Sequence, residues 1–284
     1  MTIITILICI ALQKFANVGG WFSLAWFEAY LKLLRPWLKK INEWLGLLLI
    51  VAPICVVLIL LHYLLMWKMF GIFDLLLVVI VMFFAMDARD FKYELAKYFV
   101  CVEKKDATGA ANAVSEFLNN APTNMIELNR AVTKAIAWQS FTRLFSVLFW
   151  FAIFNVYGAV IYFVISLVHR TALKVDTHFA GLAKVAAQVQ DILDWLPVRV
   201  LGFSYVLAGK FSKVFNCWFK GLFTPPKANQ SLIIETSLAA IDVDIKEESI
   251  ASSLKENYEA LDLINRVLII WVIAVALFSL GTWL

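Results

Sequence analysis

Charged residues are scarce in this chain of 284 residues. Only 16% of the residues are Asp, Glu, Lys or Arg, whereas 62% are hydrophobic; ordinary soluble domains hold about a quarter charged residues. This balance argues against an ordinary soluble protein and indicates a membrane protein whose first partner is the lipid bilayer. The net charge of +4 gives no argument for a nucleic-acid partner, and we expect none.

Residues that carry redox, metal or catalytic chemistry are also few. The four cysteines are far apart and form no C-x-x-C pair, which is typical of small apolar filling residues. They are Cys9, Cys55, Cys101 and Cys217. His169 and His178 flank Asp176, but a transition metal needs three or four converging ligands. No P-loop, Rossmann glycine pattern, HExxH or nucleophile elbow is found. We therefore predict no catalytic residue, no metal site and no cofactor.

Long uncharged runs dominate the chain. The central run, residues 144–168, lacks Asp, Glu, Lys and Arg and is bracketed by Arg143 and Arg170. At about 1.5 Å per residue it is long enough to cross a hydrocarbon core of about 30 Å. Two more uncharged runs lie at about 45–67 and 267–284, and a further apolar run at about 70–86 contains one acid, Asp74. The sequence therefore predicts about four transmembrane helices in a multi-pass protein.

The sections between the predicted spans are more polar and show helical periodicity. Residues 87–142 and 169–266 are predicted to form extramembrane helices, the first of them a compact helical subdomain. The apolar stretch at 192–208 is interrupted by Pro197 and Arg199, which favours an interfacial or re-entrant element over an ordinary span. We predict an all-α integral membrane protein with a single membrane domain over residues 1–284.

Acidic residues near apolar segments are the candidate functional groups. Asp191 and Asp194 share a helix face, and Arg199 follows beyond Pro197. Two interpretations remain open: an ion pair at the membrane surface, or a site for a polar headgroup or phosphate-bearing ligand. Asp74 lies inside the predicted span 70–86, where an acid is a functional candidate. Its position one turn from the start of the span favours snorkelling or local capping.

Two sequence blocks resemble the AmpE family. The first is AWQSFTRLFSVLFWFAIFNVYGAVIYFVISLVHR, residues 137–170, and the second is DILDWLPVRVLGFSYVLAGKF, residues 191–211. The resemblance implies a bacterial inner-membrane signalling modulator tied to inducible β-lactamase and to muropeptide sensing. It also implies a functional link to an AmpD-type amidase, and a cell-wall-derived ligand or a membrane protein as partner. Within the second block, Asp191, Asp194, Trp195 and Arg199 are predicted to bind the ligand.

AmpE is in turn similar to the CobD/CbiB proteins, membrane enzymes of cobalamin biosynthesis. Those synthases carry acidic residues before the Phe-Trp pair, where this chain has Lys134, Trp138 and Thr142. Losing acids that could bind Mg²⁺ argues against the synthase chemistry. Two alternatives to a signalling modulator remain: a CobD/CbiB-like enzyme of the adenosylcobinamide-phosphate synthase type, and a transporter of a polar lipid-linked fragment with Asp74 as its carrier.

Overall fold

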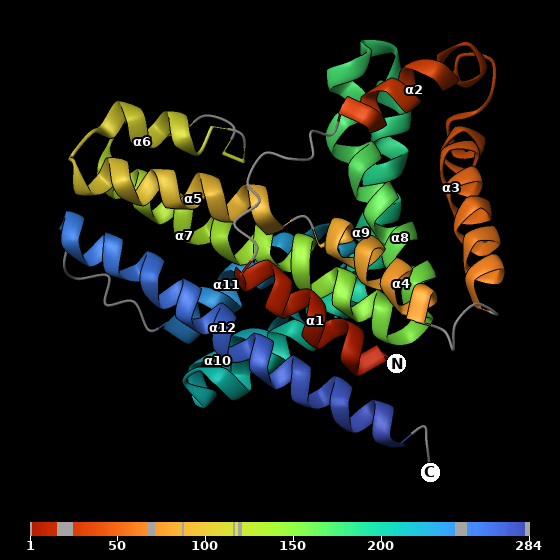
Figure 1. The fold of residues 1–284 in the computed structure, drawn as a ribbon. Coiled ribbons are helices and arrows are strands. Elements are labelled where there is room, and N and C mark those ends of the chain that lie inside the picture. The colour runs from red at the N-terminus through yellow and green to blue at the C-terminus, as the bar shows by residue number, and fades with distance from the viewer. Residues whose placement is uncertain are drawn as a thin grey trace. The chain divides into compact units, whose positions relative to one another are not determined.

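The structure is a computed structural model in which every regular element is a helix within the described part of the chain (Figure 1). The described residues are 2–15, 25–66, 72–86, 88–115, 117–118, 121–241 and 249–281. The chain divides into two compact units. One comprises Met1–Met86 and Ser146–Asp194, and the other comprises Asp87–Phe145 and Trp195–Leu284. The all-α prediction is confirmed for the described residues, while the single domain over 1–284 stays a prediction.

The first unit is organised around the long helix α8. Helices α2, α3 and α4 pack against α8, and α1 packs on α4. The bounds are α1 Thr2–Phe15, α2 Ala25–Leu38, α3 Glu43–Met66, α4 Ile72–Ala85, α8 Ser146–Val175 and the 3-10 turn η3 Thr177–Phe179. Large apolar side chains such as Phe27, Met82 and Phe151 fill its core. Burial of this apolar surface is the main force that holds the unit together.

Helix α8 is broken near its middle. Phe154 and Asn155 leave the helical region, and Asn155 adopts φ 54° and ψ −153°, a conformation that favours glycine. The backbone segments on the two sides of the break lie close together, since a Cβ at Gly158 would collide with the carbonyl oxygen of Trp150. Asn155 and Gly158 therefore shape the course of α8 itself.

The second unit packs α7 along α12, with α11 against both. Its bounds are α5 Ala88–Glu103, α6 Ala107–Ala113, α7 Met125–Ser140, the π-helical turn η2 Phe141–Phe145, α10 Phe211–Gly221, η4 Pro226–Ala228, α11 Asn229–Ile241 and α12 Ile250–Gly281. Asn124 caps α7 by accepting the backbone N–H of Ile126 at 2.9 Å. Helix α9, Ala180–Ala208, begins in the first unit and ends in the second.

A buried polar network sets the register of α5, α7 and α12. Tyr98 donates its hydroxyl proton to Asn129, and Asn129 donates to Ser253 at 2.8 Å. Thr133 donates to Asn257 at 2.6 Å, and Asn257 donates back to the Tyr98 oxygen at 3.1 Å. Each of these side chains would be costly to bury alone, so the three helices are held in one relative position.

Three helices of the described chain are long and apolar enough to cross a membrane, namely Glu43–Leu65, Met125–Val175 and Ile250–Leu277. They overlap the predicted spans at 45–67 and 267–284 and contain the predicted span at 144–168. The fourth predicted span, 70–86, corresponds to α4, which has only 14 residues and is short for a crossing helix of about 20 residues. A count of four spans is therefore not confirmed. Residues 67, 70–71 and 282–284 at the predicted span ends, and 242–248 in the polar section, lie outside the described residues.

The sections between the spans differ from the prediction in continuity. The stretch 192–208 forms the second half of α9, which runs without interruption through Pro197. The polar residues from 250 onward and the C-terminal span form a single helix, α12, of 32 residues. That these sections lie outside the membrane remains a prediction.

Candidate functional site

Asp194 is buried in the first unit, where it joins α9 to α8. Its side chain is 1% exposed. The hydroxyl of Tyr162 donates to its Oδ1 at 2.8 Å, and the hydroxyl of Ser146 donates to the same oxygen at 3.3 Å. Both donors are neutral groups from α8. Asp191, one turn earlier on α9, is partly exposed. In this arrangement the Asp194 carboxyl group acts as a link between helices.

Arg199 and Trp195 belong to the second unit, where they hold the turn between α10 and α11. Arg199 is 5% exposed. Its guanidinium donates to the carbonyl oxygens of Thr224 at 2.7 Å and Leu222 at 3.2 Å, and to the Asn229 Oδ1 at 2.6 Å. Trp195 donates its Nε1–H to the same Thr224 carbonyl at 3.2 Å. The planar guanidinium lies 4.5 Å from the centre of the Trp195 ring, a favourable cation–π arrangement.

The ion-pair interpretation does not hold for Arg199 and Asp194, because Asp194 accepts from Tyr162 and Ser146. Arg199 donates to carbonyl and amide oxygens of residues 195–229. A guanidinium suits this position, since its fixed fork of donors can satisfy several acceptors at once. Arg199 and Trp195 are brought together, while Asp194 has separate partners on α8.

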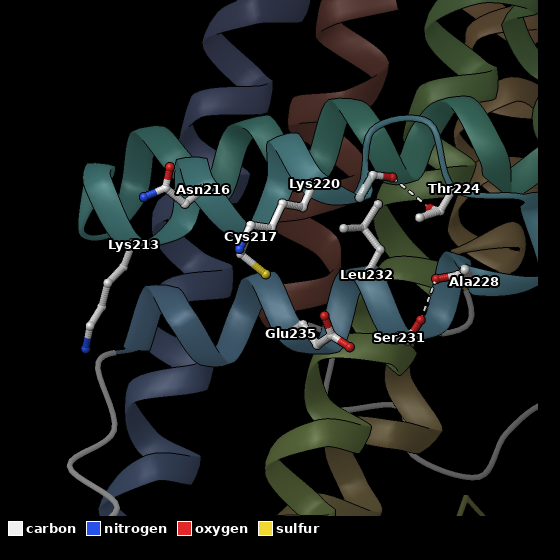
Figure 2. A pocket seen from close by; sticks show the side chains of 10 residues that line it. Lys213, Asn216, Cys217, Lys220, Thr224, Ala228, Ser231, Leu232 and Glu235 are labelled. Atoms are coloured by element: carbon white, nitrogen blue, oxygen red, sulfur yellow. Dashed lines mark hydrogen bonds between the residues drawn. The ribbon is translucent and has the colours of Figure 1, made fainter.

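The turn that Arg199 holds forms one end of a pocket between α10 and α11. Figure 2 shows its side chains extending from these two helices and from the intervening turn. The cavity has a volume of about 540 Å³. It is lined by Lys213, Asn216, Cys217, Lys220, Gly221, Thr224, Ala228, Ser231, Leu232 and Glu235. The two helices approach closely at one end of the pocket, where a Cβ at Gly221 would collide with Leu232.

The pocket lining combines apolar and polar side chains and carries charges of both signs. Lys213 and Lys220 come from α10, and Glu235 comes from α11. Ser231 donates to the carbonyl of Ala228 at 2.8 Å, which leaves the hydroxyl oxygen able to accept a further hydrogen bond. Such a lining suits a polar ligand that carries an anionic group together with hydroxyl or amide groups.

Cys217 is the lining residue with a potentially nucleophilic side chain. Burial, and then the negative charge of Glu235, raise the pKa of its thiol, while Lys220 lowers it. A thiol with a raised pKa is protonated at neutral pH and is a poor nucleophile. None of the residues that line the pocket is a histidine, so the lining contains no Cys–His pair. The arrangement is therefore suited to binding.

Sequence reasoning missed a polar contact between two helices of the first unit. The Nδ1 of His62 on α3 lies 2.6 Å from the Oδ1 of Asp74 on α4, and the ring of Tyr157 packs edge-on against His62 at 5.9 Å. A signal for this pair existed, because His62 and Asp74 are equidistant from Lys68 and an antiparallel hairpin brings such residues together. Asp74 thus has a partner on the neighbouring helix, which neither snorkelling nor local capping anticipated.

The fold and these sites define an all-helical membrane protein with a pocket that carries charged side chains, and with no strand in its described residues. A family model described as "Regulatory signalling modulator protein AmpE" matches residues 1–284. The chain belongs to the AmpE family, as the two sequence blocks predicted.

Two curated relatives are both named "Cobalamin biosynthesis protein CobD". The protein from Stutzerimonas stutzeri is 26% identical over 89 residues, which cover 31% of this chain and 29% of the relative. The protein from Chromobacterium violaceum is 24% identical over 116 residues, which cover 41% of this chain and 37% of the relative. The matched segments thus span well under half of these relatives, and they fit the predicted link between AmpE and CobD/CbiB proteins. No solved structure matches the chain significantly.

Proposed function

We propose that this protein is a multi-pass modulator in the bacterial inner membrane that couples the state of the cell wall to inducible β-lactamase. The observation that carries the proposal is the AmpE family match over residues 1–284. The family's description as a regulatory signalling modulator names the class of function. Regulation of β-lactamase, and with it antibiotic resistance, is the specific role proposed here.

The modulator binds a cell-wall-derived fragment or a protein partner in the pocket between α10 and α11. Muropeptides carry carboxylate, amide and hydroxyl groups, and the pocket offers Lys220, Glu235 and Ser231 to such groups. Arg199 and Trp195 are positioning residues, because they hold Thr224 at the end of the pocket. The functional partner in the same pathway is an AmpD-type amidase.

The two aspartates of the predicted site are not among the residues that line this pocket. Asp194 joins α9 to α8 through Tyr162 and Ser146, and Asp191 is more exposed one turn earlier. In the proposal they stabilise α9, the helix that also carries Arg199, and do not contact the ligand.

The proposal is tested by measuring nitrocefin hydrolysis after challenge with a β-lactam in three strains: wild type, deletion, and deletion restored with the wild-type gene. We expect induced activity to fall in the deletion strain and to return with the restored gene. Unchanged induction in the deletion strain would contradict the role in β-lactamase regulation.

The similarity to CobD proteins supports a second candidate, an enzyme of cobalamin biosynthesis. The matched segments cover a minority of either chain, and the acids expected before the Phe-Trp pair are replaced by Lys134, Trp138 and Thr142. Expression of this chain in a corrinoid auxotroph that lacks the synthase separates the two candidates. Growth without added corrinoid would favour the enzyme, and failure to grow despite membrane insertion would remove it.

A further inference from the structure

Helix α10 presents a row of stacked phenylalanines on its surface. Phe211, Phe215 and Phe219 are spaced four residues apart and therefore lie along one stripe of the helix. Their rings stack in sequence, with centroids 5.5 Å apart for the first pair and 5.8 Å for the second. Phe211 and Phe219 are 59% and 56% exposed. We refer to these three residues as the aromatic ladder.

The aromatic ladder is part of a larger apolar surface in the second unit. Trp218 packs against Phe215 on α10 and against Phe203 on α9, so aromatic rings continue from one helix to the next. Phe223, just after α10, is 84% exposed. Isolated exposed aromatic residues are common on proteins, but a connected surface of this kind marks a site of contact with a membrane or another protein.

The remaining sides of α10 are of a different character. Val214 is fully buried in the unit, and Gly221 packs against Leu232 of α11. Lys213 and Lys220 line the pocket, on the side of the helix away from the aromatic ladder. The helix thus has one side packed on the protein, one aromatic side and one cationic side.

The charge of the surrounding sequence favours an anionic partner. Residues 195–234 contain no Asp or Glu, whereas they contain Arg199, Lys210, Lys213, Lys220 and Lys227. Helices with aromatic residues on one face and lysines on the other lie in the membrane interface, and they bind more strongly to anionic lipids. The same unit contains α12, part of which is long and apolar enough to cross a membrane, so a bilayer is always adjacent to this unit.

We propose that α10 lies flat in the membrane surface and binds anionic phospholipid. The aromatic ladder inserts at the boundary between headgroups and acyl chains, and Lys213 and Lys220 face the phosphate groups and water. The pocket between α10 and α11 then opens on the aqueous side of this helix.

The proposal is tested by spin labelling the full chain in lipid nanodiscs of phosphatidylcholine with phosphatidylglycerol. Nitroxide labels are placed at Phe215→Cys or Phe219→Cys, and at Asn216→Cys as a matched control on the pocket side. The four natural cysteines are first replaced by alanine. Collisions with oxygen report lipid, and collisions with a water-soluble nickel chelate report the aqueous phase.

Labels on the aromatic ladder are expected to collide preferentially with oxygen, at a depth of about 5–10 Å in the interface, and the pocket-side label with the nickel chelate. Preferential nickel collision at Phe219→Cys would overturn the proposal, because it places the ladder in water. Low collision with both reagents would overturn it equally, because it indicates a protein partner that covers the ladder.

The preference of α10 for anionic lipid is tested by a separate measurement of label depth. Omitting phosphatidylglycerol should make the ladder labels shallower, and Lys213→Gln combined with Lys220→Gln should abolish this difference between the two lipid compositions. Lys255→Gln, which removes an exposed lysine charge on α12, serves as the control and should preserve it. Equal depth of the wild-type labels in both compositions would refute binding of anionic lipid.

A second experiment avoids the cysteine replacements. Benzoylphenylalanine is introduced in place of Phe219 in the otherwise unaltered chain, and membranes are irradiated. A mass increase equal to one phospholipid supports the proposal, whereas crosslinking to a protein alone contradicts it.

Discussion

At the scale of single residues, Asp194 shows how a buried acid is accommodated by neutral groups. It accepts hydrogen bonds from Tyr162 and Ser146. Asp194→Ala should lower the free energy of unfolding by about 1–3 kcal/mol, because the Tyr162 hydroxyl would lose its buried partner. Asp194→Asn retains an acceptor oxygen and should cost less. Thermal unfolding in detergent micelles measures both, with the partly exposed Asp191→Ala as control. Equal losses for the Asn and Ala variants would show that the charge, and not the acceptor, is required.

Replacing Arg199 should have a larger effect on stability, because several oxygen atoms accept hydrogen bonds from its guanidinium. Arg199→Lys leaves an ammonium that cannot reach Thr224, Leu222 and Asn229 together, and should cost about 2 kcal/mol or more. The matched control is Arg266→Lys, whose arginine is partly exposed and donates to the Ala208 carbonyl. The two variants are compared by their unfolding midpoints. Similar stability of the two would mean that Arg199 does not hold the turn.

The sequence indicated which polar residues are important more readily than it indicated which residues they contact. The sequence singled out Asp194 and Arg199 but paired Arg199 with carboxylates, because the turn at 222–229 is remote in sequence and its carbonyl oxygens leave no mark in the residue pattern. The partnership of His62 and Asp74 was also missed, although their spacing about Lys68 could have revealed it. Buried polar partners are set by tertiary packing, which local patterns do not encode.

At the scale of elements, the His62–Asp74 pair joins α3 to α4. A double-mutant cycle with His62→Ala, Asp74→Ala and the combined variant should give a coupling energy of about 0.6–1.7 kcal/mol, as found for polar contacts between membrane helices. Unfolding by a denaturing detergent in mixed micelles measures the four proteins. Additive effects of the two substitutions would contradict the pairing.

A second link between elements is the contact of α2 with Asp176, just after α8. Arg35 lies 2.7 Å from one carboxylate oxygen, and the His178 backbone N–H donates to the other at 3.0 Å. Hydrogen bonds from His178, with a contribution from the charge of Arg35, lower the pKa of Asp176 from 3.8 to about 2. A lowered pKa stabilises the fold fully above pH 4, and this contribution is lost as the pH falls toward 2.

Asp176→Asn should therefore lower the unfolding temperature at pH 7 by at most a few degrees, because the carboxylate is ion-paired at the surface. The difference from wild type should shrink as the pH falls from about 4 to 2. Unfolding temperatures at several pH values measure the effect, with the exposed Asp262→Asn as control. A difference that persists unchanged at the lowest pH would contradict the role of the Asp176 charge.

The positions of the apolar helices could largely be predicted from the sequence, but the places where a helix breaks or continues could not. Hydrophobic runs located α3, the apolar part of α8 and the C-terminal span, because membrane crossing demands length and apolarity together. The break at Asn155 has no such signal, since an asparagine in an apolar run is more often a packing residue. The sequence also did not predict that the polar residues from 250 onward and the last span form one helix, α12. The change from polar to apolar composition suggested a helix boundary there, but a helix can continue through such a change.

At the scale of the whole molecule, family membership came from two sequence blocks, and the structure adds a pocket whose lining lies outside both blocks. The second block ends at Phe211, whereas the lining residues begin at Lys213 and continue to Glu235. Arg199 and Trp195 of the second block are linked to the pocket through Thr224, because both side chains donate to its carbonyl oxygen. We therefore propose that the pocket is the working site and that Arg199 and Trp195 support it.

The most direct test of this account is β-lactamase induction in the deletion strain carrying a pocket-filling variant. Ser231→Trp inserts a large side chain into the cavity between α10 and α11, and Gln230→Trp places the same side chain on the neighbouring exposed position of α11 as a control. Immunoblotting of membranes verifies that both proteins are present. The account predicts that Ser231→Trp leaves induction at the level of the deletion while Gln230→Trp restores it. Full restoration by Ser231→Trp would contradict the pocket as the site through which this protein acts.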